Sequence, residues 1–196
     1  MKKQKIITIV GPTASGKTGL SIELAKRHSG EVISADSRQV YKDLDIGTEK
    51  VTEHEMQGIP HYCIDIASPK RAFSVEQWRR HAQVAVEKIH KHGNLPIVAG
   101  GTGFYVDSLI YNYSFPVVKP NTKLRKELSS KSTEELFEAL QRLDPRRALT
   151  IEQKNPRRLI RAIEIAVELG KVPSLSKKKS NFEATWIGIF PGLEVL

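Results

Sequence analysis

The 196 residues are enough to bury a full hydrophobic core, and the length suits one α/β domain with a substantial insertion. Hydrophobic residues make up 39% of the chain and charged residues 27%, which is typical of a soluble globular protein. No apolar run approaches the roughly 18 residues of a membrane span, and the basic residues 2–5 lead into an apolar segment unlike a cleavable signal. A single cysteine, Cys63, excludes a disulfide framework. We therefore expect a cytoplasmic protein that binds no membrane.

Short strands alternate with helices through the first 115 residues. Apolar runs predict strands at residues 6–10, 31–35 and 95–99. Apolar residues at helical spacing predict helices at residues 17–28 and 72–92, and another from Phe104. This alternation implies a parallel sheet with helices on both faces, with ligands bound at the carboxyl ends of the strands. Three segments reach that edge: residues 11–18, 36–41 and 100–103.

Beyond residue 116 the strand signals give way to helical ones. Helices are predicted at residues 122–129, 132–143 and 156–169, and the second opens with the capping pattern of Ser132 and Glu135. An apolar strand is predicted again at residues 185–190. We therefore divide the chain into a P-loop core, a helical insertion and a return strand of the core, at residues 1–115, 116–180 and 181–196.

The net charge of +9 is concentrated in the insertion, where residues 117–180 carry 16 Lys and Arg against 8 Asp and Glu. A localised positive field of this kind usually meets a polyanion such as RNA. A well-solvated, lysine-rich helical surface would give the same count, so charge alone leaves both interpretations open.

A complete phosphate-binding loop, GPTASGKT, occupies residues 11–18 between a predicted strand and a predicted helix. Its glycines let backbone N–H groups converge on phosphate oxygens, Lys17 adds a positive charge, and the helix start adds its dipole. The Thr18 hydroxyl would ligate Mg²⁺. The pattern predicts binding of a diphosphate or triphosphate. The remaining loop residues are Gly11, Pro12, Thr13, Ala14, Ser15 and Gly16.

Asp36 follows the second predicted strand at the ligand edge of the sheet. A carboxylate there can accept a proton from an attacking group or help to hold Mg²⁺, while the alternative is a turn or N-cap aspartate. Nearby Arg38, Gln39 and Tyr41 offer hydrogen-bond donors and a stacking ring, which suits a nucleobase. The histidines of the long predicted helix have no partnering carboxylate pattern, so structural roles are favoured over metal binding.

Taken together, these motifs resemble the tRNA dimethylallyltransferase family. The matching segments run in order along nearly the whole chain: GPTASGKT at 11–18, DSRQVY at 36–41 with IGT at 46–48 and Lys50, PH at 60–61 with IDI at 64–66, AGGTGFY at 99–105, and NPRR at 155–158 with RAIE at 161–164. Members of this family move a dimethylallyl group from its diphosphate to N6 of the adenosine 3′ to the anticodon of tRNA. The resemblance implies a P-loop NTPase-like fold with a tRNA-binding insertion, in a chain that is short for the family.

The resemblance also implies roles for single residues. Lys17 and the loop amides would neutralise the departing diphosphate, with Mg²⁺ as cofactor on Thr18, and Asp36 would be the base for the adenine amino group. Contacts with tRNA are implied for Asp36, Ser37, Arg38 and Gln39, for Thr102, and for Arg157, Arg158, Leu159, Ile160 and Arg161. We expect a monomer whose partners are dimethylallyl diphosphate and the anticodon stem-loop of tRNA.

Two other functions stay open at the level of sequence. A small P-loop kinase acting on a metabolite or nucleotide would explain the loop and the fold equally well, but it fits the basic insertion poorly. A nucleotide-dependent RNA-binding module without catalysis would use the charge but leave Asp36 idle.

Overall fold

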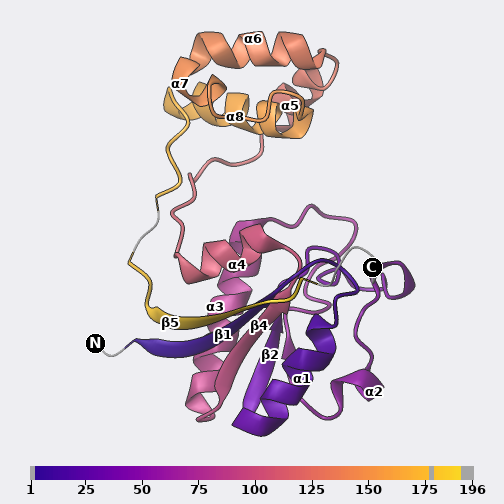
Figure 1. Ribbon diagram of the computed structural model, residues 1–196. Coiled ribbons are helices and arrows are strands. Elements are labelled where there is room, and N and C mark those ends of the chain that lie inside the picture. The colour runs from indigo at the N-terminus through magenta and orange to yellow at the C-terminus, as the bar shows by residue number, and fades with distance from the viewer. Residues whose placement is uncertain (1–2, 177–178, 191–196) are drawn as a thin grey trace. The chain divides into compact units, whose positions relative to one another are not determined.

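The computed structural model describes residues 3–176 and 179–190, which belong to two compact units (Figure 1). The first unit combines the chain up to Tyr113 with the strand that follows residue 178, and the second unit is Ser114–Ser176. Residues 191–196 of the predicted return segment lie outside the described residues. None of the described helices has both the length and the hydrophobicity that crossing a membrane requires.

A five-stranded parallel sheet forms the centre of the first unit, with the strand order β3-β2-β4-β1-β5. The strands are β1 (Gln4–Val10), β2 (Gly30–Ser34), β3 (His61–Tyr62), β4 (Leu95–Gly100) and β5 (Phe182–Gly188). The segment before β5 contains the whole second unit, so the chain returns to the sheet after the helical region.

Helices cover both faces of this sheet. The covering helices are α1 (Lys17–His28), α3 (Val75–Lys91) and α4 (Gly103–Ile110). The unit also contains the short helix α2 (Glu53–Met56), which buries no residue, and a 3₁₀ turn at Ile46–Thr48. Helix α1 packs on one face, whereas α3 and α4 pack on the other around the fully buried Trp78 (Figure 1). The Trp78 indole donates a hydrogen bond to the Ser34 carbonyl at 3.0 Å. The predicted P-loop NTPase-like fold class is confirmed.

Some predicted boundaries are wrong for identifiable reasons. Helix α3 begins at Val75 instead of residue 72, because the Ser74 and Gln77 side chains form a capping box at its start. Strand β5 covers residues 182–188 instead of 185–190, because its partner β1 pairs with it from Gln4 to Val10. The short elements β3 and α2 were not predicted, since two to four residues show no measurable periodicity.

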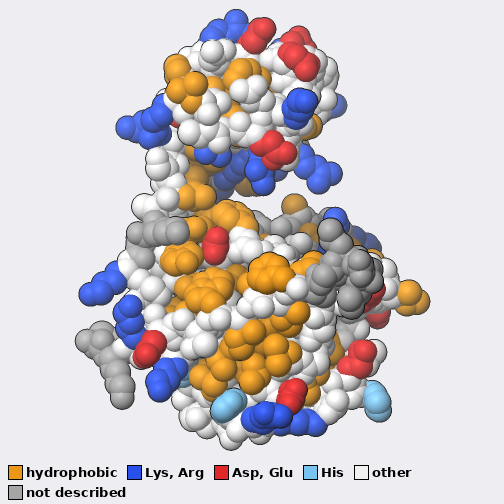
Figure 2. All heavy atoms as spheres, viewed as in Figure 1, with side chains coloured by type: hydrophobic (Ala, Val, Ile, Leu, Met, Phe, Trp, Pro, Cys, Tyr) orange, Lys and Arg blue, Asp and Glu red, His pale blue; other side chains and the backbone are white. Residues whose placement is uncertain are grey.

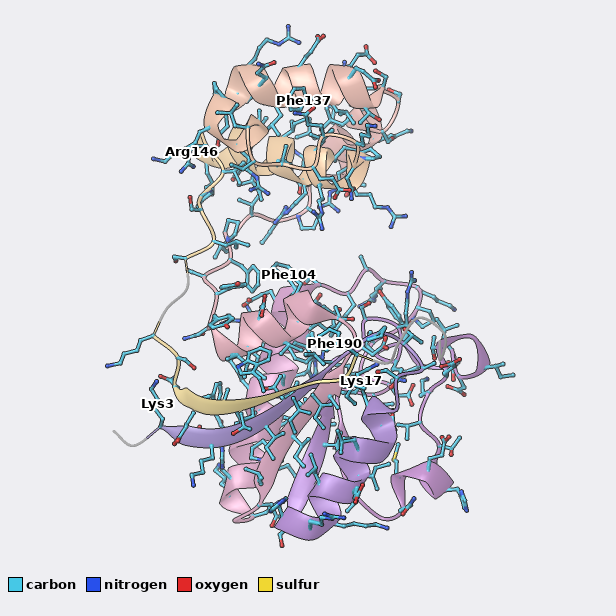
Figure 3. All side chains as sticks on the ribbon, viewed as in Figure 1. Lys3, Lys17, Phe104, Phe137, Arg146 and Phe190 are labelled. Carbon is cyan, nitrogen blue, oxygen red and sulfur yellow. The ribbon has the colours of Figure 1, made fainter. Side chains whose placement is uncertain are left out.

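The second unit is helical throughout its described secondary structure, as predicted. It contains α5 (Thr122–Leu128), α6 (Thr133–Leu143), α7 (Pro145–Ala148) and α8 (Pro156–Leu169), of which the short α7 was not predicted. Helices α6 and α8 share a core that includes Leu136, Leu140 and Ile163, with Phe137 partly buried against it (Figure 3). The face of this unit in Figure 2 carries Lys and Arg side chains together with Asp and Glu side chains. The exposed basic residues of the unit include Lys119, Lys123, Lys126, Arg157 and Arg158.

Candidate active site

A cavity of about 160 Å³ lies at the carboxyl edge of the sheet in the first unit. The loop after β1 contributes residues 13–18, the end of β2 contributes Ser34 and Asp36, and the end of β4 contributes residues 99–101. The three segments that were predicted to share the ligand edge therefore meet at one cavity. Its remaining wall comes from Ser21, Val32, Gln39, Thr48, Glu49, Val51 and His61.

The glycine loop presents a helix N-terminus to this cavity. Gly16 is the N-cap of α1 with φ of 82°, and among the described residues no side chain caps the first backbone N–H groups, which leaves them available to a ligand. Lys17, labelled in Figure 3, donates hydrogen bonds to the Pro12 carbonyl and, at 3.3 Å, to the Ser15 hydroxyl. Burial lowers the pKa of Lys17, and the negative charge of Asp36 opposes that shift. The Lys17 ammonium and the Asp36 carboxylate are thus close enough to interact electrostatically.

Asp36 is fixed by a turn. Its Oδ1 accepts hydrogen bonds from the backbone N–H groups of Arg38 at 2.7 Å and Gln39 at 3.4 Å, which leaves Oδ2 for another partner. The neighbouring Ser37 N–H donates to the Thr102 hydroxyl at 3.0 Å. Asp36 therefore does have the turn role that the sequence offered as an alternative, but only through Oδ1. The turn in this way orients Oδ2 of the same carboxylate.

Close contact between β2 and β4 also depends on glycine. A Cβ atom added at Gly100 would lie 2.2 Å from the Ala35 carbonyl oxygen, so no larger residue fits beside β2 at this level. The Ala35 carbonyl also accepts a hydrogen bond from the Thr102 N–H at 3.1 Å. The segment predicted from its glycines thus anchors the Asp36 turn.

Thr48, Glu49 and Val51 form what we call the outer wall of the cavity, and Lys50 between them ties this segment to neighbouring loops. Its side chain is only 6% exposed, and its ammonium donates to the Tyr41 carbonyl at 2.9 Å, to Asp45 at 2.5 Å and to Asp65 at 2.6 Å. Burial lowers the pKa of Lys50, but the two carboxylates outweigh burial and the pKa is raised. The sequence marked Lys50 only as part of a motif, because its partners become apparent only when the loops are folded together.

The Gln39 side chain also links two segments of the cavity wall. Its amide oxygen accepts from the Ser34 hydroxyl at 3.3 Å, and its amide nitrogen donates to the Glu49 carbonyl at 3.0 Å. Both ends of the side chain are therefore engaged within the protein. Arg38, by contrast, is exposed. The four residues predicted to contact tRNA at 36–39 thus differ in how free their side chains are.

The second predicted tRNA-contacting segment begins α8, and the structure corrects it at Leu159. This side chain is 0% exposed and belongs to the core between α6 and α8, so it cannot reach a surface ligand. Ile160 is partly buried against the same core. Arg157 and Arg158 are exposed, and Arg158 pairs with Glu152 at 3.0 Å. Because successive residues of a helix point in different directions, Arg157 and Arg158 face solvent while Leu159 faces the core.

Arg161 is committed to an internal ion-pair network. It donates to the buried Glu164 carboxylate and, at 3.0 Å, to the Val118 carbonyl. Arg125 donates two further hydrogen bonds to Glu164, at 2.9 and 2.8 Å, and the Asn121 N–H donates another at 2.6 Å. Burial raises the pKa of Glu164, but these bonds outweigh it and hold the pKa at about 2.

Metal-binding side chains do not cluster in the part of the chain that the structure describes, where no group of three His, Cys, Asp or Glu residues could hold an ion. His92 instead contacts the buried Glu31 at 2.8 Å. Cys63 is buried, and burial raises the pKa of its thiol to about 12, as suits a structural residue. A divalent ion would therefore need most of its ligands from a bound diphosphate and water, with the exposed Thr18 hydroxyl available beside them.

The family model for IPP transferases matches residues 39–194. The chain belongs to this family. It is 45% identical over 202 residues to the tRNA dimethylallyltransferase of Staphylococcus haemolyticus, a match that covers 100% of this chain and 61% of the relative. The tRNA dimethylallyltransferase of Anoxybacillus flavithermus is 47% identical over 168 residues, covering 86% of this chain and 54% of that protein. This IPP transferase chain thus spans about three-fifths of the length of such relatives.

Solved structures show the same family relationship. The full-length tRNA isopentenylpyrophosphate transferase of Bacillus halodurans is 41% identical with a TM-score of 0.62, over 95% of this chain and 60% of that one. A eukaryotic dimethylallyltransferase, described as acting on tRNA, is 31% identical with a TM-score of 0.79, over 95% of this IPP transferase chain and 48% of its own.

Proposed function

We propose that the protein transfers a dimethylallyl group from dimethylallyl diphosphate to N6 of the adenosine 3′ to the anticodon in tRNA, releasing diphosphate. Its curated relatives are named tRNA dimethylallyltransferases, and the names support the assignment of donor and acceptor. The observation that carries the proposal is the position of Asp36, whose carboxylate lines the same cavity as the phosphate-binding loop. A phosphate site with an oriented carboxylate suits displacement of a diphosphate leaving group.

The glycine loop would hold the leaving group. Backbone N–H groups at the start of α1 and the Lys17 ammonium would bind the diphosphate oxygens, where negative charge grows as the carbon–oxygen bond breaks. Lys17 would have to exchange its hydrogen bond to the Pro12 carbonyl for the ligand. Mg²⁺ bound to the diphosphate would neutralise more of that charge, and the Thr18 hydroxyl would be its protein ligand.

Asp36 would act as the base. The amino group of adenine is a weak nucleophile because its lone pair is delocalised into the ring, so removal of a proton assists attack on the prenyl carbon. The Oδ2 atom of Asp36 is the acceptor we assign to that proton, since Oδ1 already accepts from the Arg38 N–H. Thr102 would act on the acceptor side through the Ser37 backbone that its hydroxyl holds.

The RNA would be bound electrostatically as well as by contacts at the target base. Arg157 and Arg158 are exposed on the basic second unit, and Arg38 is exposed beside Asp36, so all three can reach phosphates or an unpaired base. The adenosine must leave its stack to enter a cavity, which costs a few kcal/mol and requires new contacts. We further propose that the protein works in the cytoplasm as a monomer.

A direct assay separates this function from the kinase and from a non-catalytic RNA-binding module. The chain would be incubated with Mg²⁺ and either labelled dimethylallyl diphosphate or ATP labelled in its γ-phosphate, with and without an anticodon stem-loop. Label from the prenyl donor in RNA, lost when the target adenosine is replaced by guanosine, is the expected result. Transfer from ATP to a small molecule would overturn the proposal in favour of a kinase, and RNA binding without any transfer would favour the module.

A further inference from the structure

A second hollow adjoins the candidate active site in the first unit. This groove has a volume of about 390 Å³, and its lining residues are Arg38, Tyr41, Leu44, Gly47, Thr48 and Pro69. It shares Thr48 with the wall of the candidate active site. Arg38 lies two residues after Asp36, whose carboxylate accepts the Arg38 N–H at 2.7 Å. The groove is therefore next to the cavity on the side of the proposed catalytic base.

The groove offers binding groups that the described part of the protein leaves unused. Arg38 is exposed, and its guanidinium makes no hydrogen bond or ion pair with any described residue. Tyr41 is partly exposed, and its hydroxyl likewise has no hydrogen-bond partner among those residues. Leu44 is 43% exposed, and Pro69 is exposed as well. A planar cation, an aromatic residue and apolar groups thus line one surface.

The walls of the groove are held in place by contacts within the protein. The Tyr41 N–H donates a hydrogen bond to the Arg38 carbonyl at 3.2 Å, and the Thr48 hydroxyl donates to the Leu44 carbonyl. Tyr41 also forms an isolated β-bridge with Ala67, which ties this wall to the segment that carries the lining proline. Because the groove is formed before anything binds, a ligand that enters it loses little affinity to the ordering of loops.

The lining favours a flat and mostly uncharged ligand. Among the described residues that line the groove, only Arg38 is charged, and a guanidinium can stack on a planar ring or donate to its edge. Aromatic side chains and guanidinium planes bind the faces of unstacked bases in single-stranded RNA. A nucleobase combines such a face with hydrogen-bond acceptors at its edge. The diphosphate of a prenyl donor would instead bind the glycine loop in the neighbouring cavity.

The substrate RNA would bring such a base to this place. When the target adenosine leaves its stack to enter the active site, the nucleotides next to it lose a stacking partner. We propose that the groove binds the base of a nucleotide adjacent to the target adenosine, with its face against Tyr41 and Leu44 and its edge at the Arg38 guanidinium. This inference rests on the proposed function. It extends the acceptor site to Tyr41, Leu44 and Pro69, beyond the segment 36–39.

The test measures binding of the whole chain to three anticodon stem-loops, an intact one and two that lack the base directly 5′ or directly 3′ of the target adenosine. Arg38→Gln with Leu44→Ala should weaken binding of the intact stem-loop by about tenfold. Lys42→Gln with Ile46→Ala is the matched control, because both residues are exposed in the same segment but do not line the groove. It should weaken binding by less than about twofold. With one of the two abasic stem-loops, the groove variant should lose no more than the control, since the base it would contact is gone.

Each outcome decides the inference. Equal losses with all three stem-loops, no loss with the intact one, or an equal loss in the control would overturn it. Prenyl transfer to the intact stem-loop by the unsubstituted chain is measured in parallel. Transfer together with one of those results overturns the inference alone, whereas absence of transfer overturns the proposed function and the inference with it. Thermal melts of both double variants exclude unfolding as the cause of weaker binding.

Discussion

At the scale of single residues, the Asp36 carboxylate combines an observed structural role in its turn with the role of base that we propose for it. Asparagine keeps an oxygen that can accept the Arg38 N–H, so Asp36→Asn should preserve the turn while removing the base. We expect its kcat to fall by about a hundredfold or more, with the melting temperature and diphosphate affinity close to those of the parent. Asp36→Ala loses the turn as well and should be less stable by about 1 kcal/mol. Equal transfer rates for Asp36→Asn and the parent would remove the assignment of Asp36 as base.

Lys50 is the residue whose loss should most disturb the outer wall. In Lys50→Met the Tyr41 carbonyl loses a hydrogen bond, and Asp45 and Asp65 lose the positive charge between them. We expect a decrease of about 2 kcal/mol in the free energy of unfolding and weaker diphosphate binding. The exposed Lys42 provides the control Lys42→Met, which should change stability by less than about 0.5 kcal/mol. Urea titrations of both variants would measure the difference, and equal midpoints would rule Lys50 out as an anchor.

At the scale of elements, the parts determined by nearby residues were predictable. The start of α6 follows from Ser132 and Glu135, which form the expected capping box, and α8 covers its predicted range and ends at Gly170. Strand β3 was missed because its two residues are defined only by pairing with β2. The same limit applies to the site. Asp36 could be placed by its position after a strand, whereas the role of Lys50 depends on contacts between loops.

Glu164 on α8 is the element-scale feature with the largest expected effect on stability. Its side chain is 1% exposed, and Glu164→Gln would remove the charge that Arg125 and Arg161 share. Losing the charge of a buried, hydrogen-bonded carboxylate should destabilise the second unit by about 2 kcal/mol. Glu168→Gln, one turn further along the same helix and exposed, is the matched control and should have little effect. Thermal melts followed by circular dichroism would compare them.

The same carboxylate gives the second unit a dependence on pH. Its pKa lies at about 2 in the folded chain, below the ordinary 4.5, so folding is favoured by the charged form. This contribution is complete above the ordinary value and is lost as the pH falls from there through the folded pKa. The parent should therefore lose stability between pH 4.5 and about 2 more steeply than Glu164→Gln. Parallel curves for the two proteins over that range would contradict the assignment.

At the scale of the whole molecule, the candidate active site and the proposed RNA-binding arginines of α8 belong to different units. The cavity is lined only by residues of the first unit, and the second unit, Ser114–Ser176, carries 13 Lys and Arg against 8 Asp and Glu. Substitutions in the two units should therefore have separable effects. Lys17→Met should abolish diphosphate binding and leave affinity for an anticodon stem-loop nearly unchanged, because the arginines proposed to contact RNA at the start of α8 lie in the second unit.

Substitution of Arg157 and Arg158 should have the opposite effect to Lys17→Met: weaker binding of the stem-loop with unchanged binding of diphosphate. The pair of Arg158 with Glu152 is exposed on both sides and costs little to break, so both guanidinium groups are available to phosphates. Substituting both by Gln should weaken stem-loop binding by about tenfold or more and reduce the slope of log affinity against log salt by about 1.4. Arg27 and Arg80, exposed on the first unit, allow a control that removes the same charge, Arg27→Gln with Arg80→Gln. If this control lowers the slope equally, net charge and not the start of α8 governs binding of the RNA; if only the Arg157 and Arg158 variant does, α8 contacts its backbone.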